Sequence, residues 1–363
     1  MNTSPSMLAI VTDAFGGRGG IAQYNRDFLG ALVETGAVSS ITVLPRLAPD
    51  LPAPPEKIKQ TSPRPGRIAY SVAALRIALF RRVDVVFCGH LFMAPLAKVI
   101  TRLKRAKLIV QTHGIEAWPR PSRLQRAALE AADLVLCVSR HTRAAVLSWA
   151  AITPERVLVV PDTVREEFTP RESSTQRSVL PLENKRVLLT VSRMDSRQRY
   201  KGQDRVISAI PYLVAKGHDV DYVVAGEGDD RARLEALALH MGVGERVHFL
   251  GAPELQSLIE LYRTVDLFVM PSTGEGFGIA FLEAMASGTP ALGLDVAGAK
   301  DALADGQLGT VVSEAELPVQ IARLLAAPKP DPHLLSVATR ARFGREKFVA
   351  GTSAALNRLA EVI

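Results

Sequence analysis

Short apolar runs alternate with amphipathic stretches along the whole chain. In the first half the runs are MLAIVT, SITVLP, VDVVFCGH, KLIVQTHG, ADLVLCVS and RVLVVPD. The second half repeats the pattern with RVLLTVS, DYVVAGEG, RVHFLG, DLFVMP, PALGLD and GTVVS. Apolar runs of this kind that alternate with helical periodicity predict parallel strands joined by crossover helices. The pattern therefore predicts an α/β protein with two doubly wound parallel sheets.

A polar stretch separates the two sets of strands. Residues 165–185, REEFTPRESSTQRSVLPLENK, predict a linker. We expect a first domain at 1–165 and a second domain at 166–340. The last helical segment, 341–363, follows the second sheet and precedes no further strand, so we expect it to cross back to the first domain. Ligands of such sheets bind beyond the carboxyl ends of the strands, here in a central cleft that both domains face.

The segment PSTGEGFGIAFLEAMASGTP, residues 271–290, follows a predicted strand and contains a glycine-rich turn before a helix. Gly288 is suited to end that helix. Such a turn leaves the backbone N–H groups of four residues without helical partners, and the helix dipole makes their position favourable for an anion. These residues are Gly276, Phe277, Gly278 and Ile279. The segment therefore predicts a phosphate site.

Two carboxylates belong to the same segment. Glu275 stands at the start of the turn, and Glu283 lies about two helical turns further along, roughly 12 Å away at ~1.5 Å per residue. This separation is too large for one proton transfer and matches the two ends of a long ligand. It favours two hydroxyl-binding carboxylates over an acid/base pair. The competing interpretation is that both are ordinary helix-start and solvent-facing glutamates.

Two cations bracket a loop after the first strand of the second domain. In VSRMDSRQRYKGQDRVI, Arg193 directly follows the strand and Lys201 immediately precedes the next helix. The planar guanidinium and the point charge of the ammonium suit a diphosphate. A solvated basic loop is the alternative.

The first domain has two weaker signals at predicted strand ends. FGGRGG follows the first strand, and Gly16 and Gly17 would let the backbone approach a phosphate or sugar. A plain tight turn explains it equally well, and its spacing is not that of the dinucleotide fingerprint. His113 ends the run KLIVQTHG, with Glu116 nearby, and is expected to point into the cleft. The alternative is a structural histidine.

The net charge of +7 is unevenly distributed. Residues 1–165 contain 22 Lys and Arg against 11 Asp and Glu, whereas residues 166–363 contain 22 against 26. The basic residues cluster at 67–82, 102–107 and 120–126, and the first cluster mixes Arg with Tyr, Leu, Ile and Phe as an interfacial helix does. An anionic membrane surface or a phosphorylated acceptor is therefore an expected partner. Nucleic acid is the competing interpretation, but no nucleic-acid-binding motif supports it.

The remaining composition favours a protein of the cytoplasm. Cys88 and Cys137 lie inside apolar runs, which predicts buried free thiols rather than a disulfide or a metal site. The N-terminus lacks a basic region followed by an apolar core, and no uncharged apolar run approaches the ~18 residues of a membrane span. No set of metal ligands is predicted.

Together, SRMDSRQRYKG, AGEGDDRARLE and STGEGFGIAFLEAMASGTP resemble the signature of family 4 retaining glycosyltransferases with the GT-B fold, two Rossmann-like domains that face a cleft. The resemblance covers essentially the whole chain in order and spacing. It implies that Glu275 contacts the hydroxyls of the donor sugar, Glu283 the ribose, and Arg193 and Lys201 the diphosphate. The remaining implied residues are Gly276 to Ile279 at the sugar and phosphate, Gly16 and Gly17 near the phosphates, and His113 on the acceptor side. One departure is the gap of seven residues between Arg193 and Lys201, which is longer than in many members.

The resemblance also implies an activity. The expected reaction moves a hexose from a nucleotide-diphosphate sugar to a sugar hydroxyl of a lipid-linked acceptor in cell-surface polysaccharide synthesis, at the inner face of the membrane. GDP-mannose is favoured over a UDP-sugar. No metal or cofactor is expected, because fixed cations stabilise the leaving diphosphate, which itself takes the acceptor proton. A sugar-nucleotide 2-epimerase and a non-catalytic nucleotide-sugar-binding protein are the alternatives.

Overall fold

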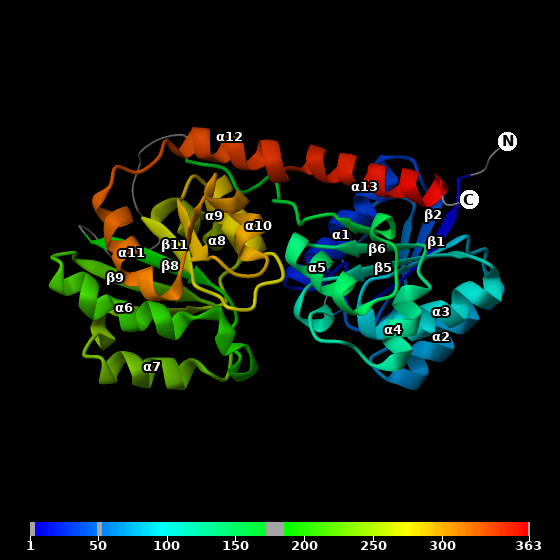
Figure 1. Cartoon of the computed structure of the whole chain (residues 1–363), viewed down its shortest axis with the longest axis horizontal. Coiled ribbons are helices and arrows are strands. Elements are labelled where there is room, and N and C mark those ends of the chain that lie inside the picture. The colour runs from blue at the N-terminus through cyan, green and yellow to red at the C-terminus, as the bar shows by residue number, and fades with distance from the viewer. Residues whose placement is uncertain (1–3, 49–52, 172–184, 362–363) are drawn as a thin grey trace. The chain divides into compact units, whose positions relative to one another are not determined.

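The structure is a computed structural model that describes residues 4–48, 53–171 and 185–361. Its contacts divide the chain into two compact units (Figure 1). Unit 1 comprises Met1–Thr163 and Glu346–Ile363, and unit 2 comprises Val164–Arg345. The sequence had suggested a boundary at 165/166. Most of the predicted linker, residues 172–184, lies outside the described residues.

Unit 1 contains a seven-stranded sheet in which every pair of neighbouring strands is parallel, in the order β3-β2-β1-β4-β5-β6-β7. The strands are β1 Ser6–Val11, β2 Ser40–Pro45, β3 Ile58–Gln60, β4 Val85–Cys88, β5 Lys107–Thr112, β6 Leu134–Cys137 and β7 Val157–Val159. All six runs predicted in the first half form strands. The short edge strand β3 was not predicted.

Helices cover both faces of this sheet. They are α1 Gly20–Glu34, α2 Arg67–Phe80, α3 Ala94–Lys104, α4 Arg123–Glu130, α5 Arg140–Trp149 and α13 Arg345–Glu361. Small and apolar residues of α2, α3 and α4 pack against alternate strand residues such as Ile10, Cys88 and Val110, and the three helices lie side by side (Figure 1). On the opposite face Phe28 of α1 stacks on Phe87 of β4, with ring centres 4.7 Å apart.

Unit 2 contains a six-stranded parallel sheet in the order β10-β9-β8-β11-β12-β13. The strands are β8 Arg186–Val191, β9 Val220–Ala225, β10 Val247–Gly251, β11 Leu267–Met270, β12 Ala291–Leu294 and β13 Thr310–Val312. The helices are α6 Gln203–Ala215, α7 Arg231–His240, α8 Leu255–Thr264, α9 Ile279–Ala286, α10 Ala299–Ala302, α11 Leu317–Ala326 and α12 Pro332–Phe343. Apolar residues of α6, α7 and α11 form one core with the sheet. The predicted α/β class with two Rossmann-like sheets is confirmed.

Each sheet has one point at which the chain order reverses. In unit 1 it lies between β1 and β4, and in unit 2 between β8 and β11. The loops that leave neighbouring strands at such a point diverge to opposite faces of the sheet and leave room for a ligand at the carboxyl edge. The loops after these four strands therefore lie where each sheet is expected to bind its ligand.

The C-terminal segment consists of two helices rather than one from residue 341. The first, α12, ends at Phe343, and the second, α13, begins at Arg345 after Gly344. A Cβ at Gly344 would lie 2.5 Å from the carbonyl oxygen of Arg340, so glycine permits this close turn. Phe348 of α13 packs edge to face on Tyr24 of α1 at 5.7 Å, which ties the last helix to unit 1.

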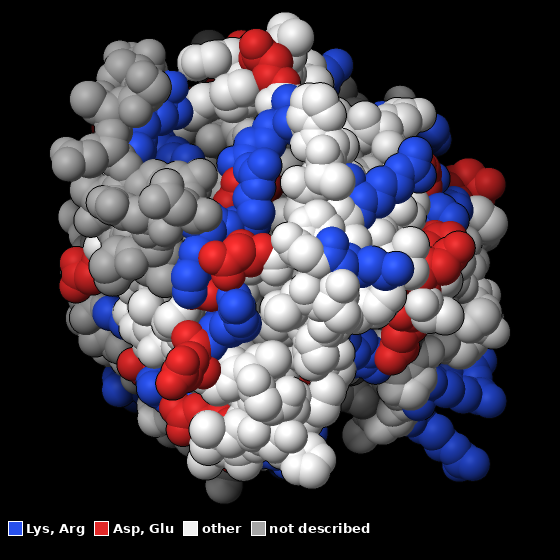
Figure 2. Space-filling view, turned by 90° about the vertical axis from the view of Figure 1, so that its left-hand side faces the viewer, with Lys and Arg blue, Asp and Glu red and all other residues white. Residues whose placement is uncertain are grey.

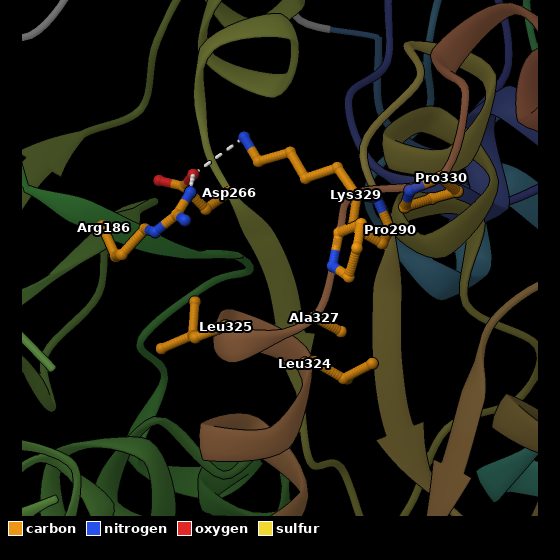
Figure 3. Close-up of a pocket in the computed structure, with 9 residues that line it drawn as sticks. Arg186, Asp266, Pro290, Leu324, Leu325, Ala327, Lys329 and Pro330 are labelled. Atoms are coloured by element: carbon orange, nitrogen blue, oxygen red, sulfur yellow. Dashed lines mark hydrogen bonds and ion pairs between the residues drawn. The ribbon is translucent and has the colours of Figure 1, made fainter.

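Opposite the carboxyl edge of the second sheet, a buried carboxylate fastens a proline-rich loop (Figure 3). Asp266, directly before β11, accepts hydrogen bonds from Lys329 at 2.8 Å, Arg186 at 3.0 Å and the N–H of Val187 at 2.7 Å. Burial alone would raise the pKa of Asp266, but these bonds outweigh it and hold the pKa below its ordinary value. A small pocket beside this cluster is lined by Pro290, Leu324, Leu325, Ala327, Pro328 and Pro330.

The surface and the cysteines complete the description. The face in Figure 2, the left-hand side of Figure 1, carries basic and acidic side chains next to one another, in keeping with the modest charge of residues 166–363. Cys88 and Cys137 are buried free thiols, as predicted. Within residues 4–48, 53–171 and 185–361, no helix combines the length and apolar character needed to cross a membrane.

Candidate functional site

The turn between β11 and α9 exposes a row of backbone donors at the carboxyl edge of unit 2. Gly278 has φ +107°, and a Cβ there would lie 2.6 Å from a ring carbon of Phe281, so glycine is required. The N–H groups of Gly276, Phe277, Gly278 and Ile279 donate to no acceptor in the part of the chain that the structure describes. At the start of α9, such donors and the helix dipole together favour a phosphate or a sugar oxygen.

The loop with the two predicted cations packs directly against this turn. Thr273 N–H donates to the carbonyl of Tyr200 at 2.9 Å. Gly202 has φ +82°, and a Cβ there would lie 2.4 Å from the carbonyl oxygen of Pro271. These contacts bring Lys201 to Glu275, where Nζ lies 2.6 Å from a carboxylate oxygen. Lys201 and Glu275, both predicted to bind the sugar donor, are therefore adjacent although they are 74 positions apart in the sequence.

Arg193 is held differently from Lys201. Its neighbour Met194 is buried in the core of unit 2 and anchors the start of the loop. Gln203 Nε2 donates to the Arg193 carbonyl at 3.2 Å and to Ser192 Oγ at 2.9 Å. The Arg193 side chain is exposed and forms no ion pair with any described residue. The backbone is therefore fixed while the guanidinium is available to a ligand.

The loop between the two cations contains a 3-10 turn, Ser196–Lys201, which ends at Lys201 and is fastened to the residues just before α7. Ser196 N–H and Oγ donate to Asp229, each at 2.7 Å. Arg199 bonds to Asp230 at 3.0 Å, and Arg197 pairs with Asp195. The long spacing is thus accommodated by a clamped turn, and Arg197 and Arg199 already have acidic partners.

Gly226 and Gly228 form the turn after β9. Both have positive φ, and a Cβ on either would lie 2.0 Å from a carbonyl oxygen, that of Ser192 or Met194 respectively. The glycines therefore let the turn after β9 pack on the loop that bears Arg193, so their role is in positioning that loop.

Glu283 lies on α9 and is buried, unlike a solvent-facing helix glutamate. Its carboxylate accepts a hydrogen bond from the hydroxyl of Tyr262 at 3.1 Å and lies 3.5 Å from the guanidinium of Arg165. Burial raises the pKa of Glu283 above its ordinary value, although Arg165 and Tyr262 act in the opposite direction. Neither partner was identified from the sequence, because they come from other elements of unit 2.

In unit 1 the glycine loop follows β1 and encloses a carboxylate. Gly16 has φ +91°. A Cβ at Gly17 would lie 2.0 Å from the Asp13 carboxyl group, so only glycine lets this carboxyl group pack directly against the loop backbone. Asp13 Oδ1 is buried without a hydrogen-bond partner among the described residues, and burial raises the pKa of Asp13. This carboxylate was not predicted from the sequence.

His113 follows β5 and is held in one orientation. Its ring Nε2 lies 3.0 Å from the carbonyl oxygen of Gly89, and the backbone N–H of His113 donates to a carboxylate oxygen of Glu116 at 2.5 Å. The bond to a carbonyl assigns the ring proton to Nε2, which leaves Nδ1 as an acceptor. Burial lowers the pKa of His113, against the opposing effects of Glu116 and Gly89, so the ring is neutral at pH 7.

A second histidine, missed in the sequence, lies beside it. His90 follows β4 as His113 follows β5, and the ring centres are 6.1 Å apart. Burial, together with the nearby His113, lowers the pKa of His90 to about 3. The same strand-end argument that selected His113 could have found His90.

The predicted site residues therefore form two groups. Unit 2 gathers seven at its carboxyl edge: Arg193, Lys201, Glu275, Gly276, Phe277, Gly278 and Ile279; Glu283 lies further along α9. Unit 1 places Gly16, Gly17 and His113 in the loops after β1 and β5. Their roles toward a ligand remain predictions.

Two family models match adjoining parts of the chain. The model described as "Glycosyltransferase Family 4" matches residues 18–168, and the one described as "Glycosyl transferases group 1" matches residues 172–345. Together they span most of both units. The sequence resemblance to glycosyltransferases is confirmed.

The relatives of this chain include enzymes whose names give different activities. The chain is 29% identical over 354 residues to a GDP-mannose-dependent alpha-(1-6)-phosphatidylinositol monomannoside mannosyltransferase of Mycolicibacterium smegmatis, covering 89% of this chain and 90% of the relative. It is 32% identical over 281 residues to a D-inositol 3-phosphate glycosyltransferase of Geodermatophilus obscurus, covering 73% of this chain and 61% of the relative.

Solved structures share the fold at low identity. HepE of Anabaena, solved in complex with UDP and glucose, superposes with a TM-score of 0.78 at 18% identity and covers 97% of this chain and 99% of its own. Sucrose-phosphate synthase of Thermosynechococcus elongatus gives a TM-score of 0.77 at 20% identity and covers 99% and 100%. These likenesses establish the two-sheet GT-B architecture.

Proposed function

The chain belongs to the family 4 glycosyltransferases with the GT-B fold, and from this premise we propose that it moves a hexose from a nucleotide-diphosphate sugar to a sugar hydroxyl of a lipid-linked acceptor in cell-surface polysaccharide synthesis. One observation carries the donor half of this proposal. The unbonded N–H groups from Gly276 to Ile279 lie in the turn that also bears Glu275, whose carboxylate contacts Lys201. This arrangement offers donors and positive charge for a diphosphate next to a carboxylate for sugar hydroxyls.

Each of these groups binds the part of the nucleotide sugar that suits its chemistry. Lys201 and Arg193 bind the diphosphate, and the four N–H groups bind phosphate and sugar oxygens. Glu275 accepts hydrogen bonds from the sugar hydroxyls. Glu283, buried on the same helix, accepts one from the ribose, with Tyr262 holding its carboxylate. The family resemblance also assigns Gly16 and Gly17 to the phosphates.

Transfer proceeds with retention of the anomeric configuration and without a metal. The bond between the anomeric carbon and the diphosphate oxygen breaks while the acceptor oxygen bonds to the same face of the sugar. The acceptor proton passes to the leaving diphosphate oxygen, so no protein nucleophile is needed. Lys201, Arg193 and the α9 N-terminus stabilise the charge that develops on the diphosphate. His113, neutral with Nδ1 as an acceptor, orients the acceptor hydroxyl.

GDP-mannose is the favoured donor and a UDP-sugar the next. The relative from M. smegmatis is named as GDP-mannose-dependent, and HepE was solved with UDP and glucose. The names of both curated relatives contain a phosphate-bearing inositol, which supports an acceptor with a phosphate group.

Unit 1 also offers a surface for a lipid-linked acceptor. The helix α2 exposes Ile68 and Phe80, each 82% accessible, next to the exposed Arg76 and Arg81. Exposed Val99 and Leu103 on α3 and Leu124 on α4 extend this set across adjacent helices. A surface of apolar and basic side chains is what an anionic bilayer binds. This surface of α2, α3 and α4 supports our proposal that the enzyme works at the inner face of the membrane on a lipid-linked acceptor.

The proposed activity is tested with a panel of GDP- and UDP-sugars and a polyprenyl-diphosphate-linked glycan acceptor. Appearance of an extended glycan together with nucleoside diphosphate, and an unchanged anomeric configuration by NMR, is the expected result. Epimerised sugar, or binding without any conversion across the panel, would instead support one of the alternatives that the sequence left open.

A further inference from the structure

Three side chains at the carboxyl edge of unit 1 form a row that ends at His113. The guanidinium carbon of Arg46, which follows β2, lies 5.8 Å from the centre of the Phe92 ring. The Phe92 ring centre lies 4.0 Å from that of His90, and His90 is the neighbour of His113. The row therefore leads from the end of β2 to the histidine predicted to face the acceptor.

Arg46 carries a charge that no carboxylate balances among residues 4–48, 53–171 and 185–361. One of its terminal nitrogens donates to the carbonyl of Pro65 at 3.0 Å, and its Nε is buried without a hydrogen-bond partner within the same ranges. A planar guanidinium without an acidic partner, held in place by a carbonyl and an aromatic ring, is suited to bind the oxygens of a phosphate.

Phe92 and His90 supply the complementary contacts for a hydroxylated ring. Phe92 is 43% exposed although it adjoins buried residues, so a large apolar surface is available beside polar groups. His90 Nδ1 accepts from the Phe92 N–H at 3.4 Å, which assigns the proton of the neutral ring to Nε2. The Nε2–H group of His90 has no acceptor among the described residues and can donate to a hydroxyl.

We propose that Arg46, Phe92 and His90 form an acceptor subsite for a hydroxylated ring that carries a phosphate group. The phosphate binds to the Arg46 guanidinium, the ring packs against the exposed part of Phe92, and one hydroxyl accepts from His90 Nε2. A neighbouring hydroxyl then faces Nδ1 of His113. This inference rests on the proposed function and adds the chemical class of the acceptor. The phosphate belongs either to a soluble ring phosphate or to a lipid head group.

Calorimetry with three probes tests the subsite. The wild-type protein is expected to bind myo-inositol 1-phosphate at least tenfold more tightly than either myo-inositol or inorganic phosphate. Arg46→Gln should weaken binding of myo-inositol 1-phosphate about tenfold or more, because it removes a charge-assisted contact. Phe92→Leu keeps an apolar side chain. It should weaken binding of myo-inositol 1-phosphate (the ring phosphate) severalfold and leave the affinity for inorganic phosphate unchanged. Arg46→Lys, which keeps the charge without the planar fork, should retain part of the affinity.

Controls separate this subsite from general charge and from the donor site. Arg102→Gln makes the same charge change at an exposed position of α3 and should leave the affinity for all three probes unchanged. Equal binding of the ring phosphate and inorganic phosphate, or equal losses in Arg46→Gln and Arg102→Gln, would overturn the proposal, as would a wild type that binds neither phosphate probe. Vesicles with 10% phosphatidylinositol in phosphatidylcholine, compared with the soluble probe, show which source of phosphate the subsite prefers.

The two proposals fail in different ways. Binding of GDP and UDP should be the same in Arg46→Gln and wild type. A wild type that transfers hexose, with Arg46 and Phe92 variants that retain full affinity for the ring phosphate, refutes the subsite and leaves the proposed function standing. A wild type that neither binds nor uses any nucleotide sugar refutes the proposed function, whatever unit 1 binds.

Discussion

Lys201 Nζ lies 2.6 Å from a carboxylate oxygen of Glu275, and the two side chains are only 16% and 12% exposed. One is predicted to bind the diphosphate and the other the sugar. Without a ligand each therefore serves as the counter-ion of the other, so the cation is held in position by the carboxylate. Mutation of one partner consequently changes the environment of the second.

We expect Glu275→Ala to abolish sugar transfer while the affinity for nucleoside diphosphate stays the same or rises, because Lys201 loses its competing partner. Lys201→Ala and Arg193→Ala should each lower that affinity about tenfold or more, since charge-assisted contacts contribute ~1.5–3 kcal/mol. Calorimetry with GDP and UDP measures the affinities. The control is Arg197→Ala on the same loop, whose guanidinium pairs with Asp195 and should not matter. A parallel loss of diphosphate affinity in Glu275→Ala would contradict the division of roles.

Gly278→Ala is expected to reduce both stability and donor affinity. Its positive φ costs a non-glycine residue about 1–3 kcal/mol, and the new methyl group would press on Phe281 and shift the N–H groups of the turn. Gly217→Ala is the matched control, because Gly217 has φ +84° after α6 with no atom near the added Cβ. Thermal unfolding should show a loss in both variants, but only Gly278→Ala should lose donor affinity, by tenfold or more. Equal donor affinity in both would remove the turn from the binding site.

The sheets could be predicted because each core strand contains a short run of mostly apolar residues. The strand β3, with the sequence IKQ, has one apolar residue and lies at the sheet edge, where its pairing with β2 determines its conformation. The strand-end argument found Arg193, Glu275 and His113 because each directly follows or adjoins a predicted strand.

Contacts between distant segments could not be predicted in this way. The ion pair between Lys201 and Glu275 depends on the close approach of Gly202 to Pro271, which is a property of two packed loops. The burial of Glu283 likewise depends on Tyr262, a residue of another helix. Periodicity places a residue on a face or at an end but does not give its tertiary neighbours.

The pH dependence of stability should reveal His90. Its pKa falls from the ordinary value of 6.5 to about 3 in the folded protein, so the unfolded chain binds the proton more tightly. Stability from this group is complete above pH 6.5 and is lost as the pH falls toward 3. Between pH 7.5 and 5.5, His90→Gln should lose about 1.4 kcal/mol less free energy of unfolding than wild type. His240→Gln removes an exposed histidine of α7 and should behave as wild type. Identical pH profiles for all three proteins would show that His90 protonates freely in the folded state.

The apolar and basic surface of α2, α3 and α4 predicts binding to anionic vesicles. Phe80 and Ile68 would enter the interface, and Arg76 and Arg81 would contact lipid phosphates, each contributing ~1 kcal/mol near the surface. Arg82 contributes less, because it pairs with Asp84 at 2.9 Å. The protein should therefore sediment with phosphatidylglycerol vesicles at low salt and much less at 0.5 M salt, since added ions screen this attraction.

Variants distinguish this surface from general stickiness. Arg76→Glu with Arg81→Glu, and separately Phe80→Ser, should each weaken vesicle binding several-fold without changing the affinity for GDP or UDP. Leu239→Ser removes another highly exposed apolar side chain, from α7 of unit 2, and should leave vesicle binding intact. Bilayer affinity increases with the apolar area inserted and with the basic charge at the surface. Only changes on the surface of α2, α3 and α4 should therefore weaken vesicle binding. Loss of vesicle binding in Leu239→Ser as well, or sedimentation that persists in the arginine variants, would refute this membrane orientation and favour an acceptor taken from solution.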